Sequence, residues 1–134
     1  MQEEIEREMR LRGATFSEVA SSLLREAVRM RRVPGVVFMD GPAGRRASIA
    51  GTGLDVWEVI ATFKSVGEDH GRLRASYEWL SDRQLSAALA YYGLYPGEID
   101  ARIEEEERWT PARLYEELPF VRPRNGLSTD EPGA

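Results

Sequence analysis

Residues 51 to 100 read GTGLDVWEVIATFKSVGEDHGRLRASYEWLSDRQLSAALAYYGLYPGEID and carry the clearest structural signal of the chain. Asp55 is followed three residues later by Glu58, the pattern of a capping box, which predicts that a helix begins near Val56. Apolar side chains then recur with the spacing of one helix face, at Val56, Val59, Ile60 and Phe63. Trp57 lies one position off this stripe and is expected to widen its core face.

Two further helices are predicted in the same stretch. Ser81 caps a strong helix whose apolar face repeats at Leu85, Ala88, Leu89 and Tyr92. A shorter helix fits roughly from Gly71 to Glu78, with Leu73 and Tyr77 facing inward. Three short helices around one apolar centre, the last two joined by a tight turn, predict a helix-turn-helix domain over residues 51–95. Trp79, in that turn, is expected to wedge between the two helices.

The order and spacing of these pieces resemble the domain-of-unknown-function family numbered 433. The resemblance rests on Gly51-Thr52, Val56-Trp57-Glu58-Val59-Ile60, Leu80-Ser81, Gln84-Leu85, Ala87-Ala88-Leu89-Ala90-Tyr91-Tyr92 and Glu98-Ile99-Asp100. The chain departs from the family at Gly53 and Asp55, where Arg and Pro are usual, and in the longer stretch from Gly67 to Gly71.

That family is similar to VapB-type antitoxins, so the resemblance implies a homeodomain-like helix-turn-helix and an antitoxin of a type II toxin–antitoxin system. The implied partner is a PIN-domain ribonuclease toxin, neutralised by stoichiometric binding. The implied second activity is repression of the antitoxin's own operon by a homodimer, with the last helix of the motif in the major groove of the operator DNA.

The residues expected to contact DNA lie on this motif and on a preceding hairpin. Arg83, Gln84 and Ala87 begin the last helix and would meet base edges, because Arg reads guanine and Gln reads adenine by paired hydrogen bonds. Arg72 and Arg74 are available for phosphates. Arg45-Arg46, beside a glycine turn, is either a phosphate contact or a solvated rim. Asp82 places a negative charge at the same entrance, where it also favours the helix dipole.

Composition is typical of a small, mostly helical protein. The chain has 134 residues, no cysteine and a net charge of −5, so neither a disulfide nor a thiolate metal site is expected. It has no apolar run of membrane-spanning length and no secretory signal, so a cytoplasmic location away from membranes is expected. Residues 97–118 hold eight acidic side chains and three arginines, whereas residues 45–96 hold six of each sign. This balance argues against strong DNA binding and favours a basic partner.

Residues 1–35 and 36–50 precede the motif. Glu3 to Arg12 predicts a weakly amphipathic helix ending at Gly13, and Thr15 with Glu18 is a capping box for a second helix through Arg32. This α-hairpin weakly resembles the helices of a ribbon-helix-helix repressor, but no residues precede it to form the strand, so a dimerisation or packing element is favoured. Residues 36–50 predict a β-hairpin, expected to pack on the helices or to join a hairpin from a second copy.

Residues 96–118 predict an acidic helical arm, with one helix over Glu98 to Trp109 and another restarting at Thr110-Pro111. Residues 119–134 are expected to be disordered without a partner. The arm and tail would cover the toxin's basic cleft, with contacts from Arg102, Arg108, Trp109, Arg113, Tyr115 and Leu118. The expected fold is therefore mainly α with one small β-hairpin: an N-terminal α-hairpin, a homeodomain-like three-helix core and an acidic helical arm.

No enzyme, metal site or cofactor is predicted. His70 is the single histidine, and the adjacent Glu68 and Asp69 cannot both reach one ion from an ordinary loop, so a solvated loop histidine is favoured. The consecutive glutamates of residues 104–107 point in different directions around a helix and do not make a paired acid-base site. The alternative function is a non-catalytic interaction module whose helix-turn-helix is a packing scaffold and does not bind DNA.

Overall fold

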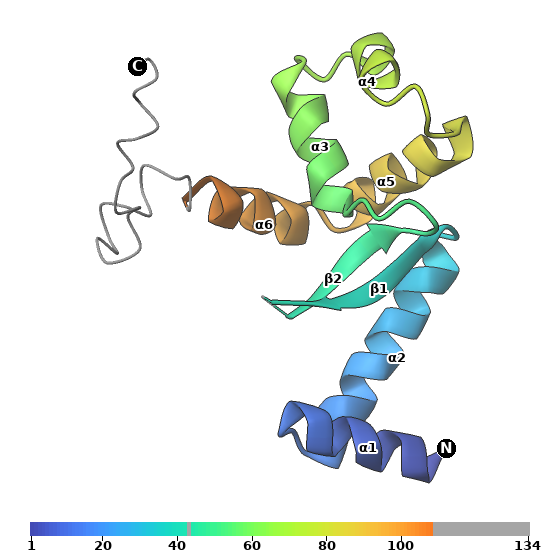
Figure 1. Ribbon diagram of the computed structural model, residues 1–134, viewed down its shortest axis with the longest axis vertical. Helices are drawn as coiled ribbons and strands as arrows, with labels where there is room; N and C mark the ends of the chain where they lie inside the picture. Colours follow the sequence, from blue (N-terminus) through green and yellow to red (C-terminus); the bar gives the residue numbers. More distant parts are fainter. Residues whose placement is uncertain (43, 109–134) are drawn as a thin grey trace, which may run out of the picture. The chain divides into compact units, whose positions relative to one another are not determined.

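The computed structural model describes residues 1–42 and 44–108. The elements in this part of the chain are α1 (Gln2–Arg12), α2 (Phe16–Arg32), β1 (Val36–Gly41), β2 (Gly44–Ile49), α3 (Val56–Ser65), α4 (His70–Ser76), α5 (Asp82–Leu94) and α6 (Pro96–Arg108) (Figure 1). The strands form one antiparallel hairpin in which Val36 pairs with Ile49. The predicted mainly helical fold with a small β-hairpin is confirmed. The chain divides into two compact units, Met1–Pro96 and Gly97–Ala134.

Side-chain caps fix where helices of the first unit begin. Thr15 Oγ1 accepts a hydrogen bond from the Glu18 N–H at 3.1 Å, and Glu18 Oε1 accepts one from the Thr15 N–H at 2.9 Å. Ser81 and Gln84 make the same reciprocal pair at the start of α5, at 3.0 and 2.8 Å. Asp69 caps α4 through the Arg72 N–H. These bonds satisfy amide donors that the first helical turn leaves unpaired.

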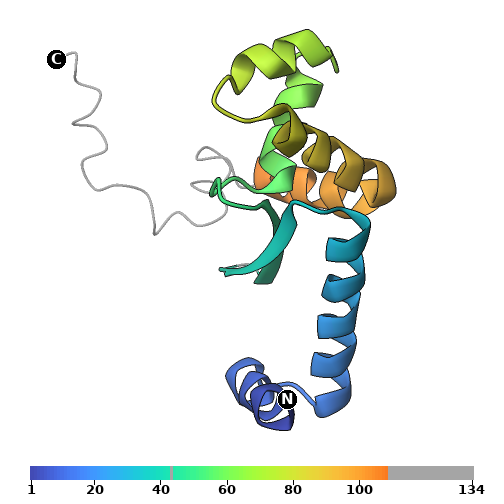
Figure 2. The same cartoon turned by 90° about the vertical axis from the view of Figure 1, so that its right-hand side faces the viewer.

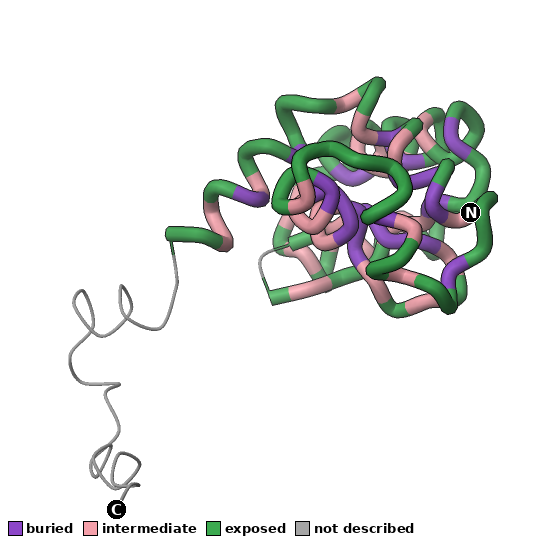
Figure 3. Tube along the Cα trace, turned by 90° about the horizontal axis from the view of Figure 1, so that it is seen from above, coloured by how far each residue is buried: buried purple, intermediate pink, exposed green. Residues whose placement is uncertain are grey.

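The core of the first unit lies where α3, α5 and the hairpin meet, next to the C-terminal end of α2 (Figures 1 and 2). α3 contacts both α4 and α5, and α5 contacts both strands. Buried positions are purple along the trace of Figure 3. The buried apolar residues include Val33, Val36, Ile49, Val56, Val59, Ile60, Leu73, Leu80, Ala88 and Tyr91. Residues 1–35, 36–50 and 51–95, which the sequence predicts as three separate segments, therefore all contribute side chains to one core.

α5 is buried on two sides, whereas the sequence predicts a single apolar stripe. Leu85 and Ala88 are buried as predicted, but Ala87 and Tyr91 are buried too, while Leu89 and Tyr92 are half-buried. The hairpin and the residues before it create the second side. A Cβ on Gly35, whose φ is +103°, would lie 3.3 Å from the Ala87 Cβ. Helical periodicity within one segment does not reveal a second packing surface.

The buried residue of the turn between α4 and α5 is Leu80 rather than Trp79. Leu80 is 1% exposed and Trp79 is 63% exposed, with its ring edge-on to Tyr77. The prediction that Trp79 wedges between the two helices is therefore wrong, because the turn directs Leu80 inward instead. Tyr77 is half-buried as predicted, and its hydroxyl lies 3.0 Å from the Thr62 Oγ1.

α6 begins at Pro96, two residues before the start that the sequence suggests, because proline fits the first helical position without losing a hydrogen bond. Ile99 and Ile103, one turn apart, are its buried residues. The predicted helix after Thr110 and the tail of residues 119–134 lie outside the described residues. Within the described part of the chain, no helix combines the length and apolar character needed to cross a membrane.

Candidate functional site

The predicted DNA-contact residues lie on α4, α5 and β2, and most of them make contacts within the fold. Arg72 and Arg83 are exposed. Arg74 is held at the turn, where its Nη1 donates to the carbonyl oxygens of Leu80 and Tyr77 and its Nε lies 3.3 Å from an Asp82 carboxylate oxygen. The guanidinium therefore closes the turn between α4 and α5 and neutralises the acidic entrance of α5.

Two of the three side chains expected to meet base edges are also used by the fold. Gln84 is half-buried, and its Oε1 accepts the Ser81 N–H as part of the helix cap. Ala87 is 6% exposed and faces Gly35. Of the predicted base-reading residues, only Arg83 presents its side chain at an exposed position in this conformation.

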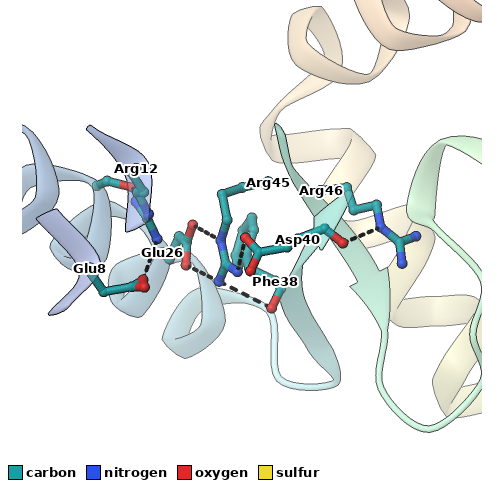
Figure 4. A network of polar contacts seen from close by, with 8 residues as sticks. Glu8, Arg12, Glu26, Phe38, Asp40, Arg45 and Arg46 are labelled. Atoms are coloured by element: carbon teal, nitrogen blue, oxygen red, sulfur yellow. Dashed lines mark hydrogen bonds and ion pairs between the residues drawn. The ribbon is translucent and has the colours of Figure 1, made fainter. Parts of the chain in front are cut away.

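Arg45 forms a bidentate ion pair with the Glu26 carboxylate of α2. Its Nε and Nη2 donate to the two oxygens of Glu26 at 2.9 and 2.8 Å, and its Nη1 donates to Asp40 at 3.0 Å (Figure 4). The hydrogen bond to Glu26 raises the pKa of Arg45 above its ordinary value. Glu26 is buried, so this bidentate pair compensates the cost of burying its charge. Arg45 thereby attaches the hairpin to α2.

Arg46 points to the opposite face of the hairpin, toward Asp55. The Asp55 carboxylate accepts hydrogen bonds from Arg46 Nη1, from Ser48 Oγ at 2.9 Å and from Trp57 Nε1 at 3.2 Å. The Asp55 N–H donates to Glu58 Oε1 at 2.8 Å, as the predicted capping box requires. Asp55 therefore joins the hairpin to α3 as well as starting the helix. The alternation of β2, which places Arg46 and Ser48 on one side, is the sequence signal that points to this arrangement.

A second cluster, which the sequence analysis did not single out, joins α2 to α5. Arg29 Nη1 donates to the hydroxyl of Tyr91 at 2.9 Å, and the Arg29 guanidinium lies 4.2 Å from the ring centre of Tyr95. Arg32 donates to the Tyr95 hydroxyl at 3.3 Å. The partners are more than sixty residues apart, so no local pattern predicts them. Cation–π contacts of this kind fix the end of α2 against α5.

α6 concentrates negative charge on a short helix. Residues 97–108 hold six acidic side chains and two arginines, a formal charge of −4. The predicted partner-contact residues Arg102 and Arg108 form ion pairs within the helix, with Glu106 at 2.8 Å and Glu105 at 2.6 Å. The other predicted contact residues lie outside the described part of the chain: Trp109, Arg113, Tyr115 and Leu118.

The described residues include no cluster with the composition of a metal site. His70 is exposed at the start of α4. Its ring lies edge-on to the ring of Phe63, with 5.1 Å between the two ring centres. Among residues 1–42 and 44–108, no group of three or more His, Cys, Asp or Glu side chains could hold a metal ion. Comparison of the chain with protein-family models, curated proteins and solved structures finds no match.

Proposed function

We propose that the protein is a non-catalytic binding protein, the antitoxin of a type II toxin–antitoxin pair, which neutralises a PIN-domain ribonuclease by stoichiometric binding. The observation that carries this proposal is the separation of charge along the chain. Residues 97–108 hold a formal charge of −4, whereas residues 45–96 are neutral. The resemblance of residues 51–100 to an antitoxin-like family supplies the class of partner.

Charge complementarity supports the proposed mode of inhibition. A ribonuclease must attract a polyanion, so its RNA-binding cleft presents cations. The exposed carboxylates of α6 include those of Glu98, Asp100, Glu104 and Glu107. Their negative charges would replace the phosphates of the RNA in that cleft. Arg102 or Arg108 would reach the metal-binding carboxylates of the toxin, and the toxin would then be covered without any bond chemistry by the antitoxin.

Reversing two of these charges tests the proposal. We expect Glu104→Lys with Glu107→Lys in the full chain to weaken toxin binding by about 30-fold at low salt, because each lysine replaces an attraction by a repulsion. The loss should shrink as salt screens the charges. The measurement is a titration of ribonuclease activity, and of binding heat, with the protein of the neighbouring reading frame, which this proposal expects to be a PIN-domain ribonuclease.

The matched control is Glu68→Lys with Glu78→Lys, which makes the same change of net charge at exposed positions of the first unit. This variant should bind the toxin as the unchanged chain does, within about twofold. If the two double variants lose affinity equally, α6 does not contact the toxin. If the unchanged chain neither binds nor inhibits the PIN-domain protein, the antitoxin proposal is wrong.

A second candidate function, an interaction module that does not bind DNA, is favoured by the way the fold uses its arginines. Arg45, Arg46 and Arg74 are each engaged by carboxylates. For this module we expect only weak retention on duplex DNA, removed by moderate salt and by Arg72→Ala with Arg83→Ala. Filter binding or fluorescence anisotropy measures it. A preference of about a thousandfold or more for the DNA upstream of the reading frame, over random DNA, would instead establish a repressor.

A further inference from the structure

The apolar face of α2 is wider than the part that residues 1–42 and 44–108 cover. Val19 is 1% exposed, but on the adjoining face Phe16, Leu24 and Val28 are 51%, 68% and 54% exposed. Together with Ala20 these residues follow at four-residue steps, so they form one continuous stripe. Isolated exposed apolar residues are common on protein surfaces, whereas a contiguous stripe indicates a contact surface.

Two hollows lie on either side of Leu24. The first, of about 440 Å³, lies between α1 and α2, and is lined by Ile5, Ala20, Leu23 and Leu24 with Glu4 and Glu8 at its edge. The second is lined by Leu24, Val28 and Tyr95 and is edged by Arg25 and Arg29. Figure 2 shows α1 at the N-terminal end of α2, away from α3 to α5. Carboxylates therefore edge the first hollow, where Glu8 is paired with Arg12 and Glu4 lies 3.8 Å from the N-terminal amine, and arginines edge the second.

We propose that this stripe is the interface of a homodimer in which the α2 helices of two copies pair antiparallel about a two-fold axis near Leu24. In this arrangement Val28 of one copy lies opposite Ala20 of the other and fills the first hollow. Arg25 of each copy then approaches Glu4 of the other, so both ends are complementary at once, as two-fold symmetry requires. In a parallel pairing, the carboxylates of one copy would instead face the same carboxylates of the other copy.

The size of the stripe suggests how tight this dimer is. With 17 residues, α2 is about 25 Å long, so a single helix face gives an interface at the small end of specific contacts. We therefore expect a dissociation constant on the order of micromolar. This inference goes beyond the proposed function, because it concerns the chain alone and is tested without the toxin.

Sedimentation velocity of the full chain, from low to high micromolar concentration, tests the proposal. We expect a monomer–dimer equilibrium, and Leu24→Glu should raise its dissociation constant by about 100-fold or more, because the change occurs twice at the centre of the interface. Leu94→Glu makes the same change on an exposed leucine of α5 and should leave the constant within about twofold. Circular dichroism confirms that both variants remain folded.

A charge exchange tests the antiparallel arrangement independently of any effect on folding. Glu4→Arg or Arg25→Glu alone should weaken the dimer by about tenfold, and the two together should restore it. A chain that is monomeric at every concentration, or a dimer unaffected by Leu24→Glu, would overturn the proposal, as would failure of the double exchange to restore dimerisation. If Leu24→Glu impairs only binding of the PIN-domain protein, the stripe serves that partner and the homodimer proposal is wrong.

Discussion

Tyr91→Ala is expected to lower the free energy of unfolding by about 4 kcal/mol, because it removes a large side chain from the centre of the core. Tyr91 is fully buried. Its ring centre lies 6.3 Å from that of Phe38 on β1 and 4.8 Å from that of Tyr95. The alanine would leave a cavity where α5 meets the hairpin and would remove the acceptor of the Arg29 hydrogen bond. Urea unfolding followed by circular dichroism measures the change.

Two control variants separate the contributions of the ring and the hydroxyl. Tyr91→Phe retains the ring and should cost about 1 kcal/mol, the value of one hydrogen bond. Tyr92→Ala truncates the neighbouring tyrosine, which is half-buried beneath Lys64 at the α3 side, and should cost clearly less than Tyr91→Ala. If the two alanine variants were equally destabilised, the inward direction of Tyr91 would be contradicted, and α5 would have the single stripe that its sequence predicts.

The sequence predicted the helices and the hairpin because their signals are local. A cap and the residue three positions later, or apolar residues within one turn, act on each other inside a single segment. The Thr15–Glu18 box and the Ser81 cap are present where the sequence placed them, and in the structure Gln84, predicted as a DNA contact, completes the Ser81 box. α4 begins at His70, one residue before the predicted start at Gly71, because Asp69 is its cap. The sequence did not predict this role for Asp69.

The roles of the arginines could not be predicted in the same way. An arginine that binds a phosphate and one that binds a carboxylate have the same local sequence, and the partner decides between them. Glu26 reaches Arg45 across 19 residues of chain, and Tyr91 reaches Arg29 across 62. Tertiary packing makes those pairs. Likewise, the local sequence of α2 does not show that Leu24 and Val28 stay exposed, because tertiary packing decides which of its apolar side chains are covered.

Asp55→Ala is the second substitution with a large expected effect, a loss of about 3 kcal/mol in the free energy of unfolding, because it breaks a mostly buried ion pair and its hydrogen bonds together. The side chain of Asp55 is 7% exposed and that of Arg46 is 30% exposed. Without the carboxylate, the buried Ser48 hydroxyl and the Trp57 N–H also lose their acceptor. The measurement is again urea unfolding of the full chain.

Asp69→Ala separates this effect from helix capping. Asp69 is an exposed N-cap of α4, so its removal should cost about 1 kcal/mol, as the loss of a cap does. If Asp55 served only as the cap of α3, the two variants would be equally destabilised. In an Arg46→Met background, Asp55→Ala should cost less than in the unchanged chain, by about 1 kcal/mol or more, because the ion pair has already been removed. Equal costs in both backgrounds would show that Arg46 and Asp55 are not coupled, and the ion pair would then contribute nothing to the attachment of the hairpin to α3.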